Sequence, residues 1–232
     1  MTKYILAIDQ GTTSTTALLI NTDLQVVAKA STEILPTYPQ YGWVEHDLNA
    51  IWAGTLKTID VLTKSGSFSV NDIACIGITN QRETVGVWDR KTGQPLHHAI
   101  VWQCRRTTDR CEDLKKISGL PAKVKEVTGL VLDPYFSGTK IEWLLKNVPG
   151  IRKKSENGEA VFGNIDTYLI HRLTGGDVYA TDVSNASRTM LMSLNNMQWH
   201  EEFLHLLDIP NKSLPKICSS SEVFGKTKGL VI

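Results

Sequence analysis

The sequence lacks the signals that would send a protein to or through a membrane. No stretch approaches about 18 consecutive apolar residues, the length that predicts a membrane-spanning helix. The apolar residues 4–8 run directly into Asp9, so we expect no secretory leader. None of the four cysteines forms a Cys-x-x-Cys pair, which excludes the usual spacing of a structural zinc site. We expect a cytoplasmic protein with reduced thiols and no membrane partner.

A surplus of charge is also missing. The 25 basic and 24 acidic side chains give a net charge of +1, whereas surfaces that neutralise nucleic-acid phosphates are usually basic, so we expect no nucleic-acid partner. The 17 Gly and 8 Pro are ordinary amounts and exclude collagen-like or low-complexity chains. The 232 residues fit one large domain or two small ones, with about 70% of the unfolded surface buried on folding.

Familiar hydrolytic and metal motifs are absent as well. The six histidines show neither His-Glu-x-x-His nor another metal-binding spacing, and no Gly-x-Ser-x-Gly segment occurs. We therefore set nucleophilic hydrolysis aside. Cys75 lies inside an apolar run and is predicted to be a small core residue.

What is present predicts a mixed α/β fold. Apolar runs at 4–8, 15–20 and 24–30, separated by turn residues, predict a β-meander. Asp47 is expected to cap a helix with apolar residues at a 3.6-residue period, ended by Gly66. Further strands are predicted over 73–78, 85–89 and 99–102, and helices over 107–117, 139–147 and 166–173. Strands that cluster first and then alternate with helices predict a mixed sheet flanked by helices.

The first candidate site is the segment 9–14, between two predicted strands. Gly11 allows a close backbone approach, and Thr12, Thr13 and Ser14 place three hydroxyls in a row, as a phosphate-binding loop requires. Asp9, at the strand end, suits a hydrated Mg²⁺. An ordinary hairpin turn uses the same residue types and is the alternative interpretation.

The second candidate is the polar segment 79–84 after an apolar strand, where ligands bind in open α/β sheets. Arg82 offers N–H donors and Glu83 accepts from hydroxyls, which suits an uncharged polyhydroxyl substrate. Neighbours on a strand point to opposite faces, so both serve one ligand only if the backbone turns there. A surface Arg–Glu pair is the alternative.

Aromatic and basic residues are further candidates for contacts with a ligand. Trp102 and Tyr135 could clamp the C–H edge of a small polyol, although rings of this kind more often fill a core. Arg105, Arg106 and Arg110 could indicate an anionic ligand, but nearby acidic residues favour a solvated helix face.

Six segments together extend this local interpretation. They are 8–14, 42–47, 78–84, 100–107, 133–140 and 185–191, in that order along the chain. As a set they resemble the FGGY family of carbohydrate kinases and, within it, the glycerol kinases. The resemblance runs from Tyr4 to about Gly225, nearly the whole chain, and is far more specific than any one segment.

The resemblance implies an actin-like, ribonuclease-H-like fold, with residues 1–232 as the N-terminal kinase domain. It implies ATP, Mg²⁺ and glycerol as ligands, sn-glycerol 3-phosphate and ADP as products, and a homo-oligomer when the protein is full length. By position, Thr12, Thr13 and Ser14 match the family's nucleotide-phosphate loop, and Asp9 matches its Mg²⁺-associated carboxylate. The matching glycerol-binding positions are Arg82, Glu83, Trp102 and Tyr135.

Two departures from the family pattern matter. Thr16 stands where the family usually has Arg, two residues after the serine of the loop. The family's general base, an Asp in a Gly-Asp-Gln-Gln segment, does not occur and is expected beyond Ile232, in a C-terminal domain. We therefore expect the chain alone to be inactive. A kinase for another polyol or sugar, and a non-catalytic glycerol-binding or regulatory module, are the alternatives.

Overall fold

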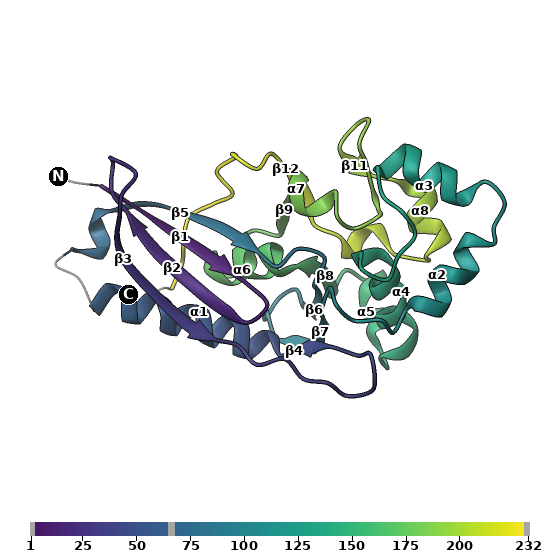
Figure 1. Cartoon of the computed structure of the whole chain (residues 1–232), viewed down its shortest axis with the longest axis horizontal. Helices are drawn as coiled ribbons and strands as arrows, with labels where there is room; N and C mark the ends of the chain where they lie inside the picture. The colour runs from purple at the N-terminus through teal and green to yellow at the C-terminus, as the bar shows by residue number, and fades with distance from the viewer. Residues whose placement is uncertain (1–2, 65–67, 230–232) are drawn as a thin grey trace.

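The computed structural model describes residues 3–64 and 68–229, in which the strands form two four-stranded sheets (Figure 1). The first sheet has the order β3-β2-β1-β5, with β5 parallel to β1 and the other neighbours antiparallel. Its strands are β1 (Tyr4–Gln10), β2 (Ser14–Ile20), β3 (Val26–Glu33) and β5 (Ile73–Asn80). The second sheet is antiparallel and contains, in order, β4 (Glu45–His46), β7 (Pro95–Ile100), β6 (Val85–Asp89) and β8 (Ala160–Asn164).

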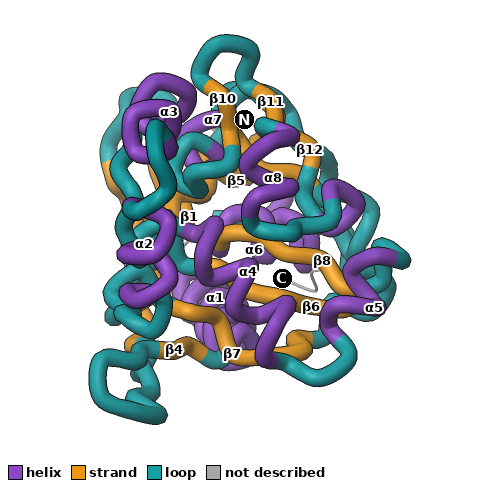
Figure 2. The backbone as a smooth tube through the Cα atoms, turned by 90° about the vertical axis from the view of Figure 1, so that its right-hand side faces the viewer, coloured by secondary structure: helices purple, strands orange, loops and turns teal. Residues whose placement is uncertain are grey.

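Helices cover these sheets. Helix α1 (Leu48–Lys64) packs on β2 and β3, and α4 (Ser137–Asn147) and α5 (Ile151–Glu156) lie in front of the second sheet in Figure 2. The other helices are α2 (Thr108–Lys115), α3 (Leu120–Thr128), α6 (Ile165–Leu173), α7 (Val183–Ala186), α8 (Glu201–Leu206), η1 (Val70–Asp72) and η2 (Asn211–Ser213). Two short pairs, β9 (Ala180–Asp182) with β12 (Lys216–Cys218) and β10 (Met192–Ser193) with β11 (Gln198–Trp199), complete the fold. Among the described residues, no helix is both long and apolar enough to cross a membrane.

The strands β6 and β8 of the second sheet are buried on both faces, and β6 shows why. Side chains alternate along a strand, so Val85 and Val87 enter one apolar cluster while Trp88 enters the other. Gly86 lies on the Trp88 face, where a Cβ atom would come within 2.7 Å of Leu48 in α1. Helices therefore pack on both faces of β6.

Most predicted elements are confirmed, with ends displaced by a few residues. The meander, the helix starting after Asp47, the hairpin of β6 and β7, and the helices α2, α4 and α6 all form. Asp47 accepts a hydrogen bond from the Asn49 amide at 2.8 Å, as expected of a cap. The predicted helix end at Gly66 lies outside the described residues. The sequence does not predict the helices α3, α5, α7 and α8.

The prediction that Cys75 is a core residue is wrong, because its side chain is exposed. Strand β5 is the edge of the first sheet, and Cys75 pairs in register with Ile5, which is 36% exposed. The apolar residues of β1 that α1 covers, Leu6 and Ile8, alternate with Ile5 and point the other way. Cys75 therefore lies on the uncovered face.

The solvated helix face predicted for the three arginines is wrong for Arg106. Its side chain is buried, with Nη2 donating to Glu45 at 2.6 Å. The guanidinium carbon lies 3.9 Å from the ring centroid of Trp43 and 4.6 Å from that of Trp143. Aromatic faces and a carboxylate together replace the water that the cation loses. Arg105 and Arg110 stay partly exposed and pair with Asp133 and Glu142.

We expect Gly163→Ala to destabilise the fold by about 1–3 kcal/mol through overpacking. A Cβ atom at Gly163 would lie 2.6 Å from Thr167 Cβ and 2.8 Å from the Trp88 ring. Urea unfolding checks this, with Gly77→Ala as the matched control. A Cβ atom at Gly77, also in a strand, meets nothing within 4 Å, so the control should stay within about 0.5 kcal/mol of wild type. Equal effects would contradict the packing described for β8.

Candidate functional site

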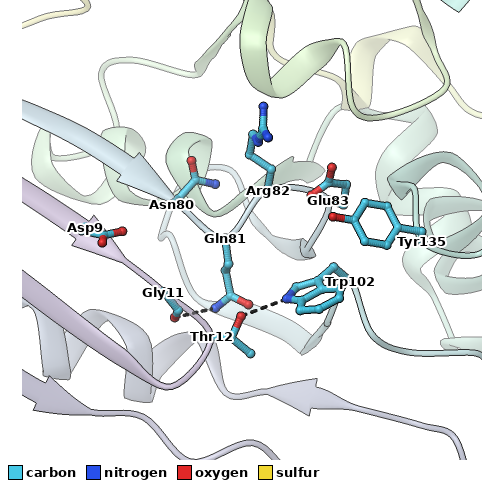
Figure 3. A pocket seen from close by; sticks show the side chains of 9 residues that line it. All are labelled: Asp9, Gly11, Thr12, Asn80, Gln81, Arg82, Glu83, Trp102 and Tyr135. Atoms are coloured by element: carbon cyan, nitrogen blue, oxygen red, sulfur yellow. Dashed lines mark hydrogen bonds between the residues drawn. The ribbon is translucent and has the colours of Figure 1, made fainter. Parts of the chain in front are cut away.

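The candidate site lies where the strands β1 and β5 end and the chain passes from the first sheet to the second. A cavity of about 270 Å³ opens there (Figure 3). It is lined by Asp9, Gly11, Thr12, Asn80, Gln81, Arg82, Glu83, Trp102 and Tyr135. Parallel strands β1 and β5 end side by side, with Gln10 and Asn80 in register, so both polar loops reach the same space.

The loop after β1 is tightly folded. The Gly11 amide donates to Ser14 O at 2.8 Å, and a Cβ atom on Gly11 would lie 3.2 Å from that same oxygen. Thr12 faces the cavity and its hydroxyl accepts from Trp102 Nε1 at 2.9 Å (Figure 3). Over residues 3–64 and 68–229 the Thr12 hydroxyl accepts this bond and donates none, so its hydrogen can be given to a ligand oxygen.

Of the other residues predicted here, Asp9 lines the cavity, whereas Thr13 and Ser14 lie beside it. Thr13 is exposed and Ser14 begins β2, and neither lines the cavity. Asp9 is exposed at the end of β1, with Thr16 as its cross-strand partner. The Thr16 hydroxyl is hydrogen-bonded to that of Ser31 at 3.1 Å. Thr16 therefore leaves the place beside Asp9 without the positive charge that an arginine would bring.

One glutamine joins the two loops. The amide nitrogen of Gln81 lies 3.1 Å from Gly11 O and 3.1 Å from Gln10 Oε1, and its backbone N–H donates to Gln10 O at 2.7 Å. On its other side Gln81 Oε1 accepts from the Thr84 hydroxyl, which in turn accepts from the Trp102 backbone N–H. Loop, turn and aromatic wall are thus one hydrogen-bonded unit.

A buried histidine completes this unit. His46 Nδ1 lies 3.1 Å from the Gln81 amide nitrogen, a contact in which a neutral imidazole accepts. Burial lowers the pKa of His46 to about 4, because desolvation disfavours the charged ring. The ring is therefore neutral near pH 7 and can act as the acceptor that orients Gln81.

The backbone turns between Arg82 and Glu83, as joint use of the two side chains requires. Glu83 has a φ of 63°, in the left-handed region that non-glycine residues rarely adopt. Glu83 is buried and Arg82 is exposed, and Figure 3 shows the guanidinium directed away from the carboxylate. Both line one cavity, with Glu83 in its wall and Arg82 at its mouth.

Three side chains outside the cavity hold Glu83. Its Oε1 accepts from Arg188 Nε at 2.5 Å, while its backbone oxygen accepts from Ser137 Oγ and from Lys140 Nζ, each at 3.2 Å. Lys140 is fully buried, and desolvation lowers its pKa to about 7. Its ammonium also donates to Tyr135 O at 2.7 Å, so it ties the two walls together.

Aromatic rings form the remaining wall. The rings of Trp102 and Tyr135 meet edge to face, with centroids 5.5 Å apart. The Tyr135 amide donates to Asp133 Oδ1 at 2.8 Å, which fixes the start of this segment. Both rings are half-buried rather than part of the core, so the expectation that they face a ligand is consistent with their placement.

Asp9 is the residue that fits a metal ion. It is an exposed carboxylate on the cavity wall, and Mg²⁺ is commonly held by one or two carboxylates while keeping several waters. Over the described residues, no group of three or more His, Cys, Asp or Glu side chains is arranged to hold a metal. Any ion here would therefore be held largely through water and ligand oxygens.

Local sequence reasoning missed Gln81, His46, Lys140 and Arg188 as parts of the site. Gln81 lies within the polar segment 79–84, so its position was a usable signal. Arg188 is 105 residues from Glu83 along the chain, and nothing near it in sequence points to a carboxylate partner. In the sequence Lys140 looks like an ordinary lysine of a helix, and only the structure shows that it is buried.

Comparison with known proteins decides the family. The family described as "FGGY family of carbohydrate kinases, N-terminal domain" matches residues 4–231. The chain belongs to the FGGY family of carbohydrate kinases. The fold is accordingly the actin-like, ribonuclease-H-like one, confirming the expectation from sequence.

Individual members of the FGGY family resemble the chain closely. A glycerol kinase from Halothermothrix orenii is 53% identical over 225 residues, which are 97% of this chain and 45% of that protein. The crystal structure of Plasmodium falciparum glycerol kinase with ADP superposes with a TM-score of 0.92 at 39% identity, covering 99% of this chain and 46% of the other. A ligand-bound xylulose kinase from Lactobacillus acidophilus gives 0.85 at 26% identity, covering 98% and 44%. The chain thus spans about half the length of the relatives it matches.

We expect the low pKa of His46 to make folding weaker in acid. Between pH 6.5 and about 4 the unfolded chain takes up a proton that the folded chain excludes, so the free energy of unfolding falls, by at most about 3 kcal/mol. Urea unfolding of wild type and His46→Gln across this range checks it, since the variant should lose that part of the pH dependence. His205→Gln, at an exposed histidine, is the control and should keep it. An NMR titration of folded His46 near pH 6.5 would contradict the expectation.

Proposed function

We propose that residues 1–232 form the N-terminal domain of an ATP-dependent glycerol kinase, which converts glycerol and ATP to sn-glycerol 3-phosphate and ADP. The observation that carries this proposal is the cavity in which a buried carboxylate and two aromatic rings lie opposite a hydroxyl-bearing loop. The similarity to glycerol kinases over 97% of the chain supports the choice of substrate.

The polyol is bound by groups of complementary chemistry. Glu83 accepts hydrogen bonds from the hydroxyls of the polyol, and Arg82 donates to its hydroxyl oxygens. The edges of the Trp102 and Tyr135 rings contact the C–H groups of the polyol. A buried carboxylate selects for hydroxyls strongly, because a ligand without them leaves its oxygen unpaired. These roles explain how charged residues can bind an uncharged substrate.

The nucleotide phosphates are bound at the loop after β1. The hydroxyls of Thr12, Thr13 and Ser14 and the backbone at Gly11 receive them, with Mg²⁺ held near Asp9 through water. Of these three hydroxyls, that of Thr12 is best supported, because it lines the cavity and has its hydrogen free. Phosphoryl transfer then depends on aligning the phosphate with the polyol across the cavity.

A general base must take the proton of the attacking hydroxyl. Glu83 is already in an ion pair with Arg188, so it is a poor candidate, and we assign no catalytic residue within the chain. We propose that a C-terminal domain, as in the longer relatives, supplies the base and the adenosine pocket. We further propose a cytoplasmic enzyme that forms a homo-oligomer when full length.

Two other functions are alternatives. The similarity to a xylulose kinase, with a TM-score of 0.85, favours a kinase for another polyol or sugar on the same fold. A non-catalytic glycerol-binding or regulatory module is the second alternative. Ligand selectivity tests the first, and turnover after reconstitution tests the second.

We expect Glu83→Gln to weaken glycerol binding by about 10- to 100-fold, the worth of a charge-assisted hydrogen bond. Isothermal titration calorimetry with glycerol, erythritol and xylulose measures the effect and the preference together. The control is Glu202→Gln, whose carboxylate is exposed and pairs with Lys123. If the wild-type chain binds xylulose more tightly than glycerol, the proposal that glycerol is the substrate is contradicted.

We expect the 232-residue chain alone to release no ADP in a glycerol-dependent manner, because we propose that the general base and the adenosine pocket lie in a C-terminal domain. A coupled assay with glycerol and Mg-ATP checks this, and turnover at roughly 1–100 s⁻¹ would contradict it.

Joining the chain to the remaining part of a glycerol kinase separates catalysis from simple binding. Activity of the joined protein supports the proposed kinase, and glycerol binding without any turnover favours the module.

A further inference from the structure

The main chain of Glu83 is held in place independently of its carboxylate. Ser137 Oγ and Lys140 Nζ, both from α4, donate to Glu83 O. The N-terminal turn of α4 is itself anchored, since the Gly138 amide donates to Thr189 O at 2.8 Å. With the backbone fixed, the orientation of the carboxylate depends on what its side-chain oxygens contact.

Arg188 makes that contact. Its Nε donates to Glu83 Oε1 at 2.5 Å, and the Glu83 side chain is 4% exposed while that of Arg188 is 28% exposed. The Arg188 guanidinium carbon lies 5.0 Å from the ring centroid of Phe136 and 5.8 Å from that of Tyr135. Arg188 is therefore held between the carboxylate and an aromatic wall of the cavity.

The second oxygen of the Glu83 carboxylate remains available as an acceptor. Over residues 3–64 and 68–229, Glu83 Oε2 has no hydrogen-bond partner, although the residue lines the cavity. An ionised carboxylate has acceptor capacity on both oxygens. One oxygen is thus occupied by a fixed cation and the other is available to a ligand.

We propose that Arg188 is the positioning residue for Glu83: it immobilises Oε1 and so directs Oε2 to the substrate hydroxyl. The inference rests on the proposed function, in which Glu83 accepts from a polyol. Arg188 acts through Glu83 and does not touch the ligand. Because Thr189 O is bonded to α4, the helix that holds the Glu83 backbone also holds the segment that carries Arg188.

A double-mutant cycle tests this role. Wild type, Glu83→Gln, Arg188→Gln and the double variant are titrated with glycerol, and the tryptophan indole N–H signals in NMR spectra report binding. We expect Arg188→Gln to weaken glycerol binding by about tenfold in wild type and by less than about twofold in the Glu83→Gln background. Arg188→Lys should restore part of the loss, since a point charge pairs with the carboxylate without the geometry of Arg.

The matched control is Arg152→Gln, which removes a surface ion pair with Asp208 and should leave glycerol binding unchanged. An equal loss in both backgrounds would show that Arg188 contacts the ligand itself and would overturn the proposal.

If the wild-type chain does not bind glycerol, the result contradicts the proposed function and not the role of Arg188. In that case the urea midpoints of the same four proteins decide whether Arg188 fixes Glu83. Non-additive shifts support the positioning contact, and additive shifts overturn it.

Discussion

The side-chain amide of Gln81 is the contact on which the arrangement of the site depends. It reaches Gly11 O in the loop after β1, Gln10 in the strand, and His46 in the second sheet. Its oxygen accepts from Thr84, which fixes the backbone at Trp102. An amide can do this because it donates and accepts at once, and burial makes each unmade bond costly. The two sheets thereby meet at a fixed distance, and the cavity walls keep their separation.

The sequence was informative wherever periodicity and turn chemistry act locally. The meander, α1 with its Asp47 cap, and the hairpin of β6 and β7 could all be predicted, because alternation and 3.6-residue spacing report which face is buried. The same signals did not reveal that the strands divide between two sheets. Which strand becomes an edge depends on distant pairing, and this is why Cys75 was placed in the core although β5 leaves it exposed.

The site divides in a similar way. Arg82, Glu83, Trp102, Tyr135, Thr12 and Asp9 could be selected from strand ends and from the family resemblance, and they line one cavity. Their binding roles stay predictions. The groups that hold them could not be selected. Arg188 meets Glu83 only after the chain has crossed both sheets, and the pKa of Lys140 is lowered mainly by its burial in the folded chain. Residues that contact a ligand leave a local pattern, whereas residues that orient them are defined by tertiary structure.

At Glu83 the left-handed backbone lowers the stability of the fold, while the side chain at this position is needed for the proposed binding of the ligand. A residue with a side chain costs about 1–3 kcal/mol in that conformation, and a buried carboxylate adds its own desolvation. Glycine would relieve both costs, and it would also remove the hydroxyl acceptor from the cavity. Selection for a more robust fold and selection for a tighter binder therefore favour different residues here. A search for stabilising substitutions that ignored the ligand would reject the glutamate first.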